Sequence, residues 1–202
     1  MCHSGTSMVP IIDGKVHHFA CIGVHNGLLI LGDDETGSYW DHVSGECLHG
    51  SLKGEKLACL PVNHLSVRAA LKRWPDLAVA IPRQSFFRRY FIQPIMRIFA
   101  NFGIFPPGFR RTMDKPDTRL PEMTSGLGLY SSQTKRFYPI QMIRENGNEW
   151  RDELDGREIK ITLDSEGFPH AVYTEGEDVP MQLFTRWYGF SYTFPGCEIG
   201  QK

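Results

Sequence analysis

Three acidic side chains flank Trp40 within a short, glycine-rich stretch of the chain: Glu35, Asp41 and Glu46. Two carboxyl groups held about 5 to 10 Å apart in a cleft can act as general acid and general base. Acidic residues beside glycines in turns are more often simply solvated, because turns lie at the surface. Solvation is the favoured interpretation, and catalysis stays an alternative.

Cysteine and histidine, the usual ligands of transition metals, are concentrated in the first 59 residues. This part holds four of the five cysteines and six of the eight histidines. His42 and His49 lie seven positions apart and match no tight spacing such as His-x-x-x-His. We favour buried thiols and surface histidines here, with a metal, haem or thiol site as the alternative.

Short strands and turns must position these residues. His17–Gly23 and Leu28–Leu31 are predicted as strands joined by an Asn-Gly turn at residues 25–27. Asp33–Gly37 is predicted as the next turn. Asn63–Trp74 is predicted as a helix that Asn63 caps and Pro75 ends.

The C-terminal part repeats this alternation. Ile140 follows Tyr138-Pro139 at the start of a predicted short helix, and Trp150–Gly156 is predicted as a polar turn. Glu158–Leu163 and His170–Thr174 are predicted as strands. Two proline pairs, 14 and 15 residues apart, bracket comparable segments in the two halves, at 61–75 and 180–195. We interpret this as a degenerate internal repeat.

Composition limits the class of protein. The chain has 202 residues, 41% of them hydrophobic and 12% aromatic, which is enough for one domain with a real core. A net charge of −1 and a pI near 6.7 give no reason to expect nucleic acid as a partner. No signal peptide or long apolar span is visible, and the compartment is left open.

Residues 82–111, called here the Arg/Phe segment, combine many aromatic and aliphatic residues with six arginines. Pro94 is predicted to break or kink any helix there. Three interpretations stay open: an insertion that packs across the domain, a segment (83–111) that contacts a membrane or a partner, and anion binding by Arg88 and Arg89. Arg97 is a further candidate for membrane or anion contact.

The most particular motif is Asp33-Asp34-Glu35-Thr36-Gly37-Ser38-Tyr39-Trp40, called here the signature loop, with spaced glycines at 45, 50 and 54. It resembles the signature of a bacterial family known as domain of unknown function 3179. In that family, tyrosine-aspartate-x-glutamate-threonine-glycine-serine-x-tryptophan recurs. The resemblance extends to Arg136–Ile140 and to Trp187. It implies no particular chemistry.

The resemblance also bears on the first residues. Cys2, followed by His3, is similar to the second cysteine of a family Cys-x-x-Cys motif, so the chain is identified as an N-terminally truncated member. We therefore expect further sequence upstream. A cysteine two residues before Met1 would complete a c-type haem pattern or a redox dithiol with Cys2 and His3.

The sequence thus predicts a β-rich α+β single domain with short helices and a degenerate repeat. Its expected divisions are 1–81, the insertion and linker 82–125, and the repeat-like half 126–202. A non-catalytic binding or structural module is favoured. A redox, metal or haem protein using Cys2 and His3, and a membrane-peripheral domain, are the alternatives; enzymatic activity, cofactor and ligand stay open. The candidate site residues are Cys2, His3, Glu35, Thr36, Gly37, Ser38, Trp40 and Glu46.

Overall fold

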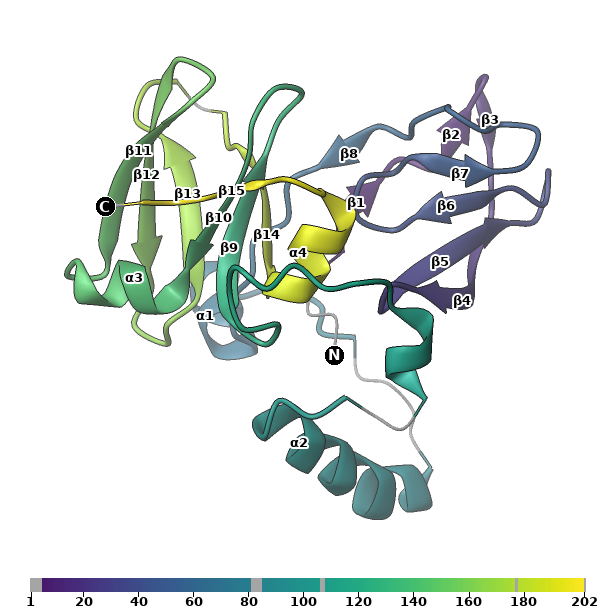
Figure 1. Ribbon diagram of the computed structural model, residues 1–202, viewed down its shortest axis with the longest axis horizontal. Coiled ribbons are helices and arrows are strands. Elements are labelled where there is room, and N and C mark those ends of the chain that lie inside the picture. The colour runs from purple at the N-terminus through teal and green to yellow at the C-terminus, as the bar shows by residue number, and fades with distance from the viewer. Residues whose placement is uncertain (1–4, 81–84, 106–107, 177, 202) are drawn as a thin grey trace. The chain divides into compact units, whose positions relative to one another are not determined.

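The computed structural model describes residues 5–80, 85–105, 108–176 and 178–201, without the side chains of Ala100 and Asn101 (Figure 1). The chain divides into two compact units. The helical unit is Leu65–Arg111, and the main unit joins Cys2–His64 to Thr112–Lys202. Strands outnumber helices, and the helices are short, which confirms the β-rich α+β class.

The first half of the main unit is a four-stranded antiparallel sheet. Its strands are β4 (Phe19–His25), β5 (Leu28–Asp33), β6 (Tyr39–Asp41) and β7 (Cys47–His49), in that order. His25 pairs with Leu28, so Asn26 and Gly27 form the predicted two-residue turn, with φ of 49° and 73°. Trp40, Cys47 and Leu57 form the core of this half. Two small pairs flank it: β1 (Ser7–Met8) with β8 (Cys59–Leu60), and β2 (Ile11–Ile12) with β3 (Lys15–Val16).

The second half contains two further sheets, seen at the left of Figure 1. One has the order β14 (Met181–Arg186), β9 (Ser125–Tyr130), β10 (Lys135–Pro139), β15 (Glu198–Ile199), with β15 parallel to β10. The other is a meander of β11 (Glu149–Leu154), β12 (Arg157–Leu163) and β13 (Pro169–Tyr173). Helices α3 (Ile140–Glu145) and α4 (Trp187–Thr193) contribute buried side chains to the two cores of this half.

Val43 joins the two halves of the main unit. Its side chain is buried in the cluster that contains Phe137, Leu183 and Phe190, far from it in the sequence. Its carbonyl oxygen accepts hydrogen bonds from the hydroxyls of Thr6, at 2.6 Å, and Tyr130, at 3.4 Å. The residues that follow the signature loop are therefore fixed against the C-terminal sheet.

The helical unit contains α1 (Val67–Arg73), the π-helical turn η1 (Arg88–Ile92), α2 (Gln93–Asn101) and most of the 3-10 turn η2 (Phe109–Thr112). No residue whose side chain is described between positions 65 and 111 is buried. This unit is therefore stabilised by local hydrogen bonds and ring contacts, without a core of its own in its described part.

Two predictions about individual elements are wrong. Residues 150–154 form most of β11 and not a turn, because Trp150 and Leu154 are buried and the segment pairs with β12. Ser66, not Asn63, caps α1, since its Oγ accepts the Ala69 N–H at 3.0 Å. Pro94 lies at the junction where the π-helical turn η1 gives way to α2, and the predicted break or kink at this residue stays a prediction.

Candidate functional site

The signature loop is organised around the carboxylate of Asp33, at the end of β5. Oδ1 accepts the backbone N–H groups of Glu35, at 3.0 Å, and Thr36, at 2.8 Å. Oδ2 accepts the Thr36 hydroxyl and the Trp40 indole N–H, the latter at 3.3 Å. His17 is the fifth partner, with Nδ1 3.1 Å from Oδ1. One buried carboxylate thus fixes the turn, the indole and the segment before β4.

These hydrogen bonds set the ionisation of Asp33. Burial by itself would raise the pKa of this carboxyl group, because it disfavours the charged form. The donors from Thr36, His17 and Trp40 outweigh that cost and lower the pKa to about 2. Asp33 is therefore a permanently charged acceptor at neutral pH, and its role in the loop is structural.

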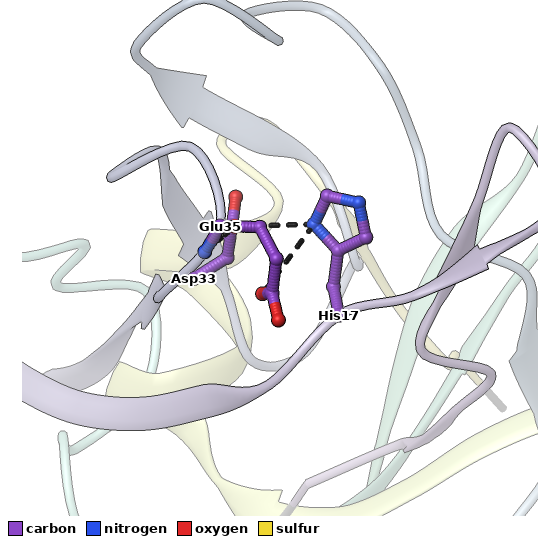
Figure 2. Close-up of side chains that lie close together, drawn as sticks. All are labelled: His17, Asp33 and Glu35. Atoms are coloured by element: carbon purple, nitrogen blue, oxygen red, sulfur yellow. Dashed lines mark hydrogen bonds and ion pairs between the residues drawn. The ribbon is translucent and has the colours of Figure 1, made fainter.

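Glu35 lies beside His17 (Figure 2), and it also contacts His18, the residue before β4. Its Oε1 lies 2.7 Å from His18 Nδ1, its Oε2 accepts the His18 backbone N–H at 2.8 Å, and Oε2 lies 3.8 Å from His17 Nδ1. The hydrogen bond and the charge of Glu35 raise the pKa of His18, and His18 lowers the pKa of Glu35. His17 is buried while His18 is exposed, so Glu35 bridges an interior and a surface imidazole.

The rest of the signature completes the loop. The Thr36 Oγ1 also lies 2.7 Å from Ser38 Oγ and can accept the Ser38 hydroxyl, and Gly37 has a φ of 66°, a conformation that favours glycine. Ser38 and Trp40 are fully buried. Thr36, Gly37, Ser38 and Trp40 are therefore brought together with Glu35 as parts of one turn, and of these residues Gly37 lines a shallow pocket beside β4 and β5.

His17, Asp33 and Glu35 form a group whose ligand atoms all lie within 4.8 Å of one another. Two carboxylates and an imidazole are suitable ligands for a divalent transition metal. Binding would require Nδ1 of His17 to exchange its proton for the metal, and Asp33 Oδ1 already accepts two backbone N–H groups. The residues fit a cation in type and spacing, but Asp33 has little remaining capacity as a ligand.

A second feature is a cleft of about 660 Å³ between the two halves of the main unit. From the first half, Asp41, Ser44, Glu46 and Lys56 line it. From the second half come Tyr130, Ser131, Ser132 and Lys135, with the end of α4 and Phe194. Its volume is in the range of small-molecule sites, which are about 300 to 1,000 Å³.

The acidic residues around Trp40 do not form one constellation. Asp41 and Glu46 line the cleft, whereas Glu35 does not. Asp41 Oδ1 accepts the backbone N–H groups of Val43, at 2.6 Å, and Ser44, at 3.2 Å, so it holds a turn. Glu46 is exposed and no hydrogen bond of its carboxylate occurs within the described part of the chain.

The other candidates lie elsewhere. Cys2 and His3 are outside the described residues, so their role as ligands stays a prediction. Among the cysteines that the structure describes, all are free thiols, with Cys21 exposed and Cys47 and Cys197 buried. Arg88, Arg89 and Arg97 belong to the helical unit.

Sequence reasoning missed the importance of His17 and Asp33. The sequence favours surface histidines in this part of the chain, but His17 is buried, and His17 and His18 both contact the same acidic cluster. The available signal was the position of Asp33 two and three residues before Glu35 and Thr36. Aspartate at that spacing commonly accepts the backbone N–H groups that follow it.

Fold and site together define a β-rich α+β protein with an acidic loop whose residues hydrogen-bond to the carboxylate of Asp33. The chain belongs to the family described as protein of unknown function (DUF3179), whose model matches residues 1–187. No curated protein and no solved structure matches the chain significantly.

Proposed function

We propose that the main unit is a non-catalytic binding module that holds a small zwitterionic ligand in the cleft between its halves. The observation that carries this proposal is the convergence of opposite charges from distant segments. Glu46 and Lys56 come from the first half, and Lys135 comes from β10 in the second half. A ligand with an ammonium and a carboxylate group would pair with both kinds of side chain.

The distribution of free and engaged groups supports binding over catalysis. Asp33 and Asp41 accept backbone N–H groups, so their carboxylates hold turns. Lys135 donates to the Ser132 carbonyl at 2.8 Å, and both residues line the cleft. Glu46 and Lys56 lie opposite each other in a β-bridge, and both side chains are exposed. These two side chains are therefore available to a ligand.

The test is thermal unfolding with free amino acids and dipeptides as zwitterions, glucose as a neutral molecule, and inorganic phosphate as an anion. A ligand that binds only the folded state raises the melting temperature with its concentration. We expect a rise with one or more zwitterions, and loss of that rise in Glu46→Gln and Lys56→Met. Glu55→Gln and Lys53→Met, exposed positions outside the cleft, are the matched controls. No rise with any zwitterion, or equal losses in the controls, would contradict the proposal.

A second candidate function is divalent-cation binding at His17, Asp33 and Glu35, favoured by the proximity of their ligand atoms. Co²⁺ is a suitable probe because its visible absorption reports coordination by protein ligands. Glu35→Gln should weaken that absorption, and Asp34→Asn, at the neighbouring exposed position, should not. Absorption that is unchanged in Glu35→Gln would place the bound cobalt elsewhere and remove this candidate.

A further inference from the structure

The Arg/Phe segment has an unusual charge pattern. No aspartate or glutamate occurs between Asp76 and Asp114, whereas arginines stand at positions 83, 88, 89, 97, 110 and 111. Arg88, Arg89 and Arg97 form no ion pair with any described residue. A strongly cationic surface without internal compensation attracts anionic surfaces.

The helical part of this segment is amphipathic. In α2 and the residue that follows it, Ile95, Ile98 and Phe102 recur at the three- and four-residue spacing of one helix face. Arg97 and Gln93 are four residues apart and lie on the opposite face. The apolar stripe extends back through η1 to the residue before it, where Phe91 stacks with Phe87 at a ring-centroid distance of 5.3 Å.

This stripe is exposed. Phe87 is 62% exposed, Ile98 56% and Phe102 75%, and the other large apolar residues of η1 and α2 are also exposed except Phe99, which is partly buried. A contiguous apolar surface of this kind marks an interaction site, because water-exposed aromatic and aliphatic groups are unfavourable. The ring pairs Phe86–Tyr90 and Phe87–Phe91 cover each other only in part.

We propose that the Arg/Phe segment is a docking surface for an anionic lipid bilayer, on which the helix lies in the interface plane. The apolar stripe would enter the boundary between headgroups and acyl chains. The arginines would extend their guanidinium groups to the lipid phosphates, since long cationic side chains reach from an apolar face to a polar layer.

The charge pattern selects this occupant over a second copy of the chain. Two Arg/Phe segments packed stripe to stripe would join two cationic segments, and neither contains an acidic residue that could compensate the added charge. A bilayer that contains acidic phospholipids supplies both an apolar phase and negative charge. No helix in the described residues is long and apolar enough to cross a membrane.

The experiment is cosedimentation of the full chain with vesicles of phosphatidylcholine alone, or of equal parts phosphatidylcholine and phosphatidylglycerol. We expect binding to the anionic vesicles only, weakened by added salt. Arg88→Gln with Arg89→Gln should weaken binding roughly 30-fold. Ile95→Ser with Ile98→Ser should weaken it by at least about tenfold, because the apolar stripe is interrupted.

The matched control is Lys72→Gln with Arg73→Gln in the last turn of α1, which removes the same charge from the same unit. It should change the affinity by less than about twofold. The segment has no buried side chain in its described part, so all variants should keep the circular dichroism spectrum of the parent.

Three outcomes would overturn the proposal. The first is absence of binding to the anionic vesicles, which is the result expected if the segment binds an acidic protein instead. The second is equal binding to neutral vesicles or an equal loss in the control variant. The third is self-association, seen by sedimentation velocity without vesicles, that Ile95→Ser with Ile98→Ser abolishes.

Discussion

Gly50 lies directly against Ser38: a Cβ atom at Gly50 would fall 2.5 Å from the Ser38 Oγ atom and 2.7 Å from its Cα. Gly50 also has a φ of 109°, which side chains rarely adopt. The turn after β7 is thus packed on the signature loop. Gly50, one of the spaced glycines of the motif, therefore belongs to the same local structure as the loop.

Gly50→Ala is therefore expected to lower the free energy of unfolding by about 2 to 4 kcal/mol, from strain and from the displaced Ser38. Gly54→Ala is the matched control, because Gly54 also has a positive φ, 94°, but open space around it. It should cost about 1 kcal/mol. Urea unfolding followed by tryptophan fluorescence measures both. Equal costs would show that the contact with Ser38 contributes nothing.

Asp33→Asn should change how stability depends on acid. The carboxyl group has its pKa lowered from 3.8 to about 2 in the folded state, so its contribution is present above pH 4 and disappears as the pH falls toward 2. The free energy of unfolding of the variant should be lower by about 2 to 4 kcal/mol at neutral pH. The variant should also lack the fall in stability between about pH 4 and pH 2 that Asp33 causes. Unfolding curves between pH 2 and pH 7 provide the measurement. Asp34→Asn keeps all the groups that donate hydrogen bonds to Asp33, so its stability should depend on pH as that of the parent does.

Glu35→Gln should lower the pKa of His18 toward the ordinary value of 6.5, since the hydrogen bond and the charge of Glu35 raise it. Because Glu35 favours the protonated form of His18, the pair contributes to the stability of the fold below the ordinary pKa of 6.5. This contribution is lost as the pH rises through the raised pKa of His18. An NMR titration of the histidine Cε1–H resonances reports it. Asp34→Asn should have a smaller effect, because Asp34 is the weakest of the causes. An unchanged His18 titration in Glu35→Gln would show that the two side chains do not pair in solution.

Thiol reactivity should follow burial. Burial raises the pKa of Cys197 to about 11 and also raises the pKa values of Cys47 and Cys59, so little thiolate is present at pH 8. Cys21 is exposed. With an aromatic disulfide reagent, Cys21→Ser should remove one rapidly reacting thiol, and Cys197→Ser should remove none. The reverse result would place Cys197 at the surface.

Local chemistry accounts for what could be predicted of the fold. The Asn26-Gly27 hairpin was predictable because two adjacent residues specify its backbone. The strand β11 was not, since polar residues dominate it. One of them, Asp152, is held by Arg136 at 2.9 Å and by the Tyr138 hydroxyl at 2.8 Å, both on β10. Only the folded arrangement shows these partners.

The same contrast holds for the site. The signature loop could be identified because its hydrogen bonds join residues a few positions apart. The cleft could not, because it needs Glu46 and Lys56 from one half and Lys135 from the other. The burial of His17 depends on its pairing with Asp33, sixteen positions later in the sequence. The three-part division of the chain and the internal repeat stay predictions.

The position of Val43 has a consequence for how the protein folds during its synthesis. Its partners Leu183 and Phe190 emerge from the ribosome long after it does, on the order of ten seconds at usual elongation rates. Until then the first four-stranded sheet has no counterpart, and Val43 is accessible to chaperones or to neighbouring nascent chains. Vectorial synthesis therefore leaves this half without its packing partners until Leu183 and Phe190 have been made.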